Sequence, residues 1–213
     1  MTPFSRRAFT TAALASPLTA CAGQGTDRTT PDSRATAPQP RSPARPRPAK
    51  GARPLARSVP VRLLVPAIGV DTPVIRLGLA PDGTVRVPPV TADDRAGWYR
   101  HSPTPGQRGP SVILGHVTVG PYGDGVFRHL ARLHRGDRIV ARLENGTAAK
   151  FAVTAVRTVP RTQFPVDDVY GNVDRPELRL ITCGGARTGD GYADNVIVFA
   201  ALSGAESPTP GER

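Results

Sequence analysis

Leu180-Ile181-Thr182-Cys183-Gly184-Gly185 ends an apolar run that begins at Leu178. A run of this kind predicts a buried β-strand, so the cysteine stands at the end of a strand. The strand would hold the sulfur rigidly, while the two glycines let the chain turn sharply and leave backbone N–H groups free beside it. This is a suitable position for a catalytic nucleophile, although a small buried cysteine at a strand end is also common.

The remainder of the chain predicts a domain made almost wholly of short strands. Apolar or alternating segments predict strands at 61–65, 70–77, 84–87, 111–117, 138–143, 150–159 and 195–202. Asp82-Gly83 and Asn145-Gly146 are typical of tight turns between strands. Residues 126–133 predict a short helix or turn, 167–171 predict a turn, and the polar residues from Ser203 predict a frayed end. Many closely spaced strands with little helix favour an all-β fold, a closed or nearly closed β-barrel.

The basic charge of the chain is concentrated in one segment. The formal net charge is +11, but eight of the basic residues and only two acids lie within 22–57, together with seven prolines. Such a segment cannot bury a core, and we expect an extended, disordered linker. The high isoelectric point therefore describes the linker, and we expect no nucleic-acid partner for the domain.

The N-terminus carries an export signal. Arg6 and Arg7 precede a small and apolar run from Ala8 to Ala20, which is too short to span a bilayer. The paired arginines resemble a twin-arginine signal, and Leu18-Thr19-Ala20-Cys21 resembles a bacterial lipobox, in which the cysteine is lipidated. The alternative is an ordinary signal peptide with a chance cysteine. Either way, we expect an extracytoplasmic protein, membrane-associated as a lipoprotein or secreted, and divide the chain into an export signal (1–21), a linker (22–57), a catalytic domain (58–203) and a C-terminal tail (204–213).

His116 is the histidine best placed to assist a thiol. The other three lie in polar surroundings, whereas His116 follows Ile113-Leu114-Gly115 in an apolar segment. A histidine on a strand is often only a core residue. A thiol nucleophile, however, needs a basic partner that activates it and protonates a leaving amine. The sequence shows no metal-binding, P-loop or dinucleotide motif, so we expect no cofactor.

Three stretches together resemble the sortases, and most closely their actinobacterial class F group. They are Leu114-Gly115-His116-Val117, Leu180 to Gly185, and Tyr192-Ala193-Asp194-Asn195-Val196-Ile197-Val198. The resemblance covers about Val59 to Leu202 in the right order. It implies an eight-stranded β-barrel and cysteine transpeptidase chemistry on a C-terminal sorting motif of the Leu-Pro-x-Thr-Gly type. His116 and Cys183 match the family's catalytic histidine and cysteine.

The resemblance fails at the third catalytic position. The family has an arginine on the strand after the cysteine, but here Ala193 precedes Asp194-Asn195 and no arginine follows up to Leu202. Arg187 is the nearest arginine after Cys183, and Asn195 is the nearest polar donor on the strand. Either could donate to an oxyanion, and we predict Arg187 as the third catalytic residue.

The partners that the resemblance implies are surface proteins bearing a C-terminal sorting motif, an amine of a peptidoglycan precursor, and the membrane through the N-terminal anchor. A cysteine L,D-transpeptidase is a rival, but its Ser-x-Gly-Cys-type motif is absent. The second rival is a catalytically impaired surface lipoprotein that keeps a sortase-like barrel for binding. The missing strand arginine is the one feature that favours it.

Overall fold

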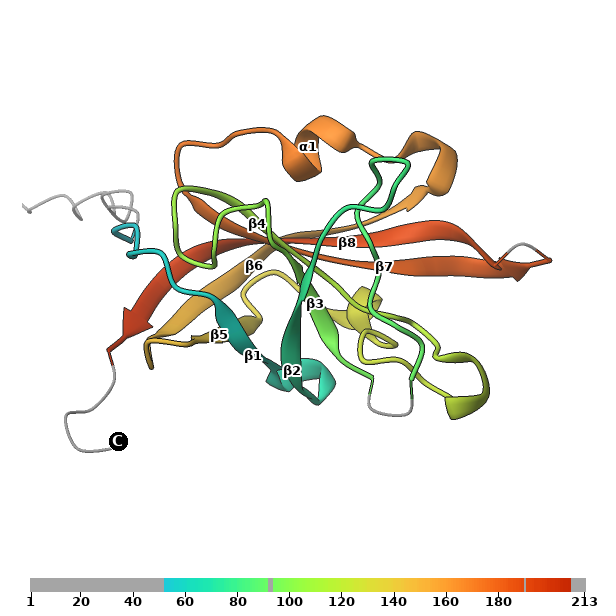
Figure 1. Cartoon of the computed structure of the whole chain (residues 1–213), viewed down its shortest axis with the longest axis horizontal. Helices are drawn as coiled ribbons and strands as arrows, with labels where there is room; N and C mark the ends of the chain where they lie inside the picture. The colour runs from blue at the N-terminus through green and yellow to red at the C-terminus, as the bar shows by residue number, and fades with distance from the viewer. Residues whose placement is uncertain (1–51, 92–93, 190, 208–213) are drawn as a thin grey trace, which may run out of the picture. The chain divides into compact units, whose positions relative to one another are not determined.

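The computed structural model describes residues 52–91, 94–189 and 191–207 (Figure 1). The predicted export signal, Cys21 and most of the predicted linker lie outside these residues. The strands are β1 (Pro60–Val65), β2 (Val70–Leu77), β3 (Ala96–Tyr99), β4 (Gly109–Leu114), β5 (Arg138–Leu143), β6 (Ala148–Pro160), β7 (Pro176–Thr188) and β8 (Gly191–Glu206). Short 3-10 helices are η1 (Pro66–Ile68), η2 (Gly120–Tyr122), η3 (Leu130–Arg132) and η4 (Arg161–Gln163), and the α-helix is α1 (Val166–Tyr170).

The strands form a closed barrel in the order β1-β2-β3-β4-β7-β8-β6-β5. The predicted all-β, eight-stranded barrel is therefore confirmed. Most neighbours are antiparallel, but β2 with β3 and β4 with β7 are parallel pairs. A parallel pair cannot be joined by a tight hairpin, so the connection from β2 to β3 must return along the length of the strands, while the chain from β4 to β7 passes through the barrel strands β5 and β6.

Alternation along the strands separates an inner and an outer apolar cluster. Leu178 and Leu180 of β7 point into the barrel core, which they share with Leu63, Phe127 and Val198. Ile181 belongs to an outer cluster with Val112, Val169, Ile197 and Phe199. Val169 is on α1, so this helix covers the outer face of β4, β7 and β8 (Figure 1). Period-two alternation thus gives β7 two buried faces, which explains its nearly continuous apolar sequence.

Several predicted elements differ from the structure. Residues 84–87 form no strand, because only an isolated bridge joins Leu79 to Val85. Residues 167–171, predicted as a turn, mostly lie in α1. The last strand begins at Gly191 and continues to Glu206, beyond the fraying predicted from Ser203, since its end pairs with the start of β6.

Residues just before β1 also belong to the packed domain. Ala52 and Leu55, placed in the linker by composition, pack against the barrel core. The backbone N–H of Leu55 donates to the carbonyl of Gly106 at 2.8 Å. Gly106 has φ +96°, and a Cβ there would meet the Leu55 side chain at 2.4 Å, so the approach requires glycine. Within the described residues, no helix is long and apolar enough to cross a bilayer.

Candidate active site

Parallel pairing of β4 and β7 brings the chain that leads to His116 next to the chain that leads to Cys183. Leu114 lies opposite Ile181, and the N–H of Gly115 donates to the carbonyl of Ile181 at 3.1 Å. His116 and Cys183 each lie two residues beyond this last pair. Adjacent strands are about 4.8 Å apart, so the two residues, 67 apart in sequence, become neighbours at the same end of the sheet.

Cys183 is an exposed free thiol on β7, and Asn195 of β8 lies directly opposite it. Residues directly opposite in an antiparallel pair project from the same face. Ile181 and Ile197, the next pair on that face, belong to the outer apolar cluster. The thiol and the Asn195 amide therefore both project from the outer face of the barrel.

The glycines after Cys183 do not make the sharp turn that we predicted. Strand β7 continues through Gly184 and Gly185 to Thr188, with a register shift between Gly184 and Arg187. Glycine is nevertheless required at both positions. A Cβ on Gly184 would lie 2.6 Å from Cγ2 of Val196, and Gly185 has φ +74° with its Cβ position 2.1 Å from Oδ2 of Asp194. The glycines thus admit a bulge and a close side-chain approach beside the thiol.

His116 is half-buried and lies just past the end of β4, not within a strand as predicted. Its Nε2 atom is 2.6 Å from the carbonyl oxygen of Pro88, in the connection between β2 and β3. A carbonyl can only accept a hydrogen bond, so Nε2 is the protonated nitrogen in this contact.

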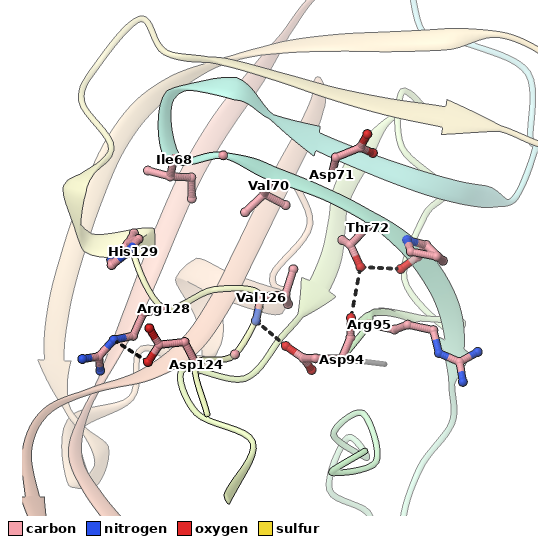
Figure 2. Close-up of a pocket in the computed structure, with 13 residues that line it drawn as sticks. Ile68, Val70, Asp71, Thr72, Asp94, Arg95, Asp124, Val126, Arg128 and His129 are labelled. Atoms are coloured by element: carbon pink, nitrogen blue, oxygen red, sulfur yellow. Dashed lines mark hydrogen bonds and ion pairs between the residues drawn. The ribbon is translucent and has the colours of Figure 1, made fainter. Parts of the chain in front are cut away.

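The segment after His116 is fixed to it by main-chain contacts. The N–H of Phe127 donates to the His116 carbonyl at 2.9 Å. Gly125 packs so closely that a Cβ there would lie 2.3 Å from the same oxygen. The N–H of Val126 donates to Oδ2 of Asp94, which lines a cavity of about 670 Å³ between β2 and residues 124–129 (Figure 2). Asp94 therefore helps to position the segment that supports His116.

A second cavity, of about 400 Å³, lies beside the thiol. Cys183, Gly184 and Gly185 line it together with Thr182 and Arg128. The Thr182 side chain is buried, and its hydroxyl has no hydrogen-bond partner in the structure. Arg128 is the charged residue of this lining, and its side chain forms a 3.2 Å ion pair with Asp124 in the larger cavity (Figure 2). Sequence reasoning missed Arg128, since nothing in its local sequence marks it.

Arg187 lies beyond the bulge, opposite Tyr192. Because Tyr192 and Asn195 are three residues apart on β8, they project from opposite faces, and Arg187 shares the face of Tyr192. Arg187 is exposed and does not line the cavity beside the thiol. The structure thus pairs Cys183 with Asn195, sets His116 just past the end of the neighbouring strand β4, and leaves Arg187 nearer the tip of the β7–β8 hairpin.

The outer face carries a further cavity, of about 540 Å³. Its lining includes Val112 of β4, Val166 and Tyr170 of α1, and Tyr99 of β3. Burial, with a smaller effect from Tyr99, raises the pKa of Tyr170, so its phenol stays neutral at ordinary pH. This cavity therefore offers a largely apolar and uncharged wall on the side to which the thiol projects.

No group of three or more His, Cys, Asp or Glu residues suited to a metal ion occurs in 52–91, 94–189 and 191–207. The chemistry available from these residues is that of a thiol next to an imidazole, with amide and guanidinium donors nearby. Such a pair can form and resolve a covalent acyl intermediate.

Comparisons with known proteins agree with this fold. Residues 63–203 match the Sortase domain family. SrtA sortase from Actinomyces oris is 24% identical with a TM-score of 0.54, over 74% of this chain and 86% of that one. Sortase A from Listeria monocytogenes is 19% identical with a TM-score of 0.52, over 72% and 92%. Sortase C-1 from Actinomyces oris is 21% identical with a TM-score of 0.51, over 66% and 72%.

No curated protein matches the chain in sequence. The family match covers well over half of the chain, and the solved structures share its fold. The chain belongs to the sortase family of cysteine transpeptidases.

Proposed function

We propose that this sortase is an extracytoplasmic class F enzyme that cleaves a Leu-Pro-x-Thr-Gly-like C-terminal motif of surface proteins. It then transfers the cleaved protein to an amine of the cell wall, supplied by a peptidoglycan precursor. The observation that carries the proposal is the β4–β7 register, whose last pair lies two residues before both His116 and the exposed thiol of Cys183. The class assignment rests on the quoted sequence stretches.

The proposed reaction has two halves. The Cys183 thiolate attacks the carbonyl carbon of the motif's threonine, and main-chain N–H groups near Cys183 stabilise the oxyanion. His116, as imidazolium, gives its proton to the leaving glycine amine when the C–N bond breaks, and a thioester remains. The incoming amine attacks the thioester and loses a proton to His116, which restores the thiol.

Two side chains are candidates for an additional oxyanion donor. Asn195 is favoured by its place opposite Cys183, on the same face. Arg187, predicted from the sequence, stays a prediction. The outer cavity next to α1 has the apolar character to receive the aliphatic side chain of a sorting motif.

The test is mass spectrometry of the protein incubated with a panel of sorting peptides. We expect a thioester on Cys183 and none in Cys183→Ala. His116→Ala should lower the rate by at least about 10²-fold, the usual scale for loss of general acid catalysis. His134→Ala, at an exposed position away from the site, is the matched control. No acylation of the wild type by any peptide would overturn the proposal.

The second candidate is a binding module without catalysis. The observation in its favour is that β8, from Gly191 to Glu206, carries no arginine. Such a protein would bind sorting peptides with its fold intact but would form no thioester, so the same experiment separates the two.

We propose that Cys21 anchors the protein to the membrane through a lipid, separate from the chemistry at Cys183. Cys21→Ser should then move the protein from the membrane fraction to the soluble fraction without changing activity on soluble peptides. Retention of the variant in the membrane fraction would contradict the anchor.

A further inference from the structure

The connection between β2 and β3 passes the proposed active site because of the barrel topology. β2 and β3 are parallel neighbours, so the chain that leaves Leu77 must run back along the strands before Ala96. Figure 1 shows this connection outside the barrel wall. Its first part folds back on itself just after β2, since the N–H of Arg86 donates to the Gly78 carbonyl at 3.0 Å and its Nε donates to the Leu79 carbonyl at 3.1 Å. Two residues after Arg86, Pro88 contacts His116.

The contact there is between a main-chain carbonyl and an imidazole. The oxygen of Pro88 lies 2.6 Å from Nε2 of His116, which is a short hydrogen bond. No other hydrogen bond to the His116 ring is formed within the described residues. Among the side chains that the structure describes, no carboxylate or amide orients the imidazole, and the Pro88 carbonyl occupies that place.

The local sequence sets the direction of this carbonyl. The ring of Pro88 fixes its φ, and the following Pro89 restricts the ψ of Pro88 to extended values. The direction of the Pro88 carbonyl is thus set by the two prolines themselves and does not depend on the contact with His116. Two adjacent prolines at the contact provide rigidity that a loop of other residues would lack.

We propose that the main-chain carbonyl of Pro88 is the positioning group of the His116–Cys183 pair. It holds the proton on Nε2 and leaves Nδ1 as the nitrogen that exchanges protons in the reaction. The thiol proton moves to Nδ1, which gives a thiolate and an imidazolium. The Nδ1 proton then goes to the leaving amine as the C–N bond breaks. A base that activates a thiol generally needs such an orienting third group. This inference rests on the proposed transpeptidase function.

The opposite role for the same contact is occlusion. If Pro88 only covered His116, the contact would have to break before catalysis, and weakening it would speed the reaction. A positioning role predicts the reverse, so one chemical change distinguishes the two.

That change is an ester bond between residues 88 and 89 in the full-length chain, with Cys21→Ser in every variant so that Cys183 is the sole thiol. The α-hydroxy acid analogue of valine at position 89 makes the Pro88 carbonyl an ester, a weaker acceptor. Pro89→Val, with the same side chain and an amide bond, is the matched control. The thermal midpoints of the two variants are compared first, to show that both fold.

We expect the ester variant to form the acyl-enzyme about threefold to tenfold more slowly than Pro89→Val, with little change in KM, the scale of one neutral hydrogen bond. Acylation by the ester variant that is as fast or faster would overturn the positioning role.

Nitrogen-15 spectra of labelled histidine provide a readout without substrate. We expect neutral His116 to carry its proton on Nε2 in the wild type and Pro89→Val, and to become a tautomer mixture in the ester variant. A proton on Nδ1 in the wild type would overturn the inference. A wild type that acylates with no peptide would overturn the proposed function, while the spectra would still decide the role of Pro88.

Discussion

Asn195 lies directly opposite Cys183 in the antiparallel pair of β7 and β8. The two side chains leave the same face, so an amide N–H of Asn195 can reach an oxygen on a carbon bonded to the sulfur. Arg187 pairs with Tyr192 instead and shares its face. The register therefore ranks the two donors that the sequence left open.

Asn195→Ala should lower kcat for peptide cleavage by about 10²-fold, since loss of one oxyanion donor costs about 10²- to 10³-fold. Arg187→Ala should change kcat by less than Asn195→Ala does, because Arg187 lies beyond the bulge, opposite Tyr192, and does not line the cavity beside Cys183. Steady-state kinetics of both variants show which of the two side chains contributes more to kcat. The reverse order of effects would restore Arg187 as the third catalytic residue.

Gly125→Ala should impair catalysis through His116. A Cβ at this position would lie 2.3 Å from the His116 carbonyl oxygen, so the main chain of one segment must move. We expect a loss of about tenfold or more in kcat/KM, as displacement of a catalytic group by about 1 Å can cost 10²-fold. Gly189→Ala is the control, since a Cβ there meets nothing within 4 Å. Equal activity of the two variants would show that the contact does not position His116.

Arg179→Ala should destabilise the barrel. The Arg179 guanidinium is 3% exposed, 2.5 Å from the Glu177 carboxylate and 4.6 Å from the centre of the Phe199 ring. Removing one partner of a buried ion pair costs about 3–5 kcal/mol when the other charge is left unpaired. Glu177 keeps its ion pair with the exposed Arg175, so we expect a loss toward the lower end of that range. Replacing both, with Glu177→Leu and Arg179→Met, should cost less than the single change. Urea unfolding of the three proteins measures this, and a double variant less stable than Arg179→Ala would contradict it.

A shortened chain that begins at Ala52 should be more stable than one that begins at Val59. Leu55 packs on the core and donates a backbone hydrogen bond to Gly106, and the shorter chain loses both. Burying a leucine side chain is worth about 1.5–3 kcal/mol. We therefore expect the thermal midpoint of the chain that begins at Val59 to be lower by an amount on the order of several degrees. Leu55→Ser in the longer chain should reproduce most of the loss. Equal midpoints would mean that residues 52–58 add nothing to stability.

Strand patterns in the sequence were sufficient to predict the barrel. The apolar runs at 61–65 and 138–143 correspond closely to β1 and β5, whereas β3 (Ala96–Tyr99) was not predicted as a strand. The turn expected at Gly184-Gly185 was wrong because glycine was taken as a turn signal. Pairing with β8 on one side overrides that local preference, and the glycines instead absorb a bulge.

Local chemistry singled out Cys183 and His116, since a thiol at a strand end and a histidine in an apolar segment are visible in the residue types. The β4–β7 register that joins them depends on long-range pairing and could not be predicted from either segment alone. Pro88 was missed for a different reason. Its contribution is a main-chain carbonyl, which every residue possesses, so no side-chain pattern indicates it.

Strand β8 pairs with β7 on one edge and with β6 on the other, over nearly its whole length from Gly191 to Glu206. Among the eight barrel strands it is the last to be synthesised. Without it the barrel has two unpaired edges, and Cys183 lies on one of them with no Asn195 opposite. A nascent chain can therefore fold most of the barrel wall but cannot assemble the site until β8 has been synthesised. A nonsense codon anywhere before β8 would give a product with open sheet edges, prone to aggregation and degradation, instead of a truncated enzyme with a working thiol.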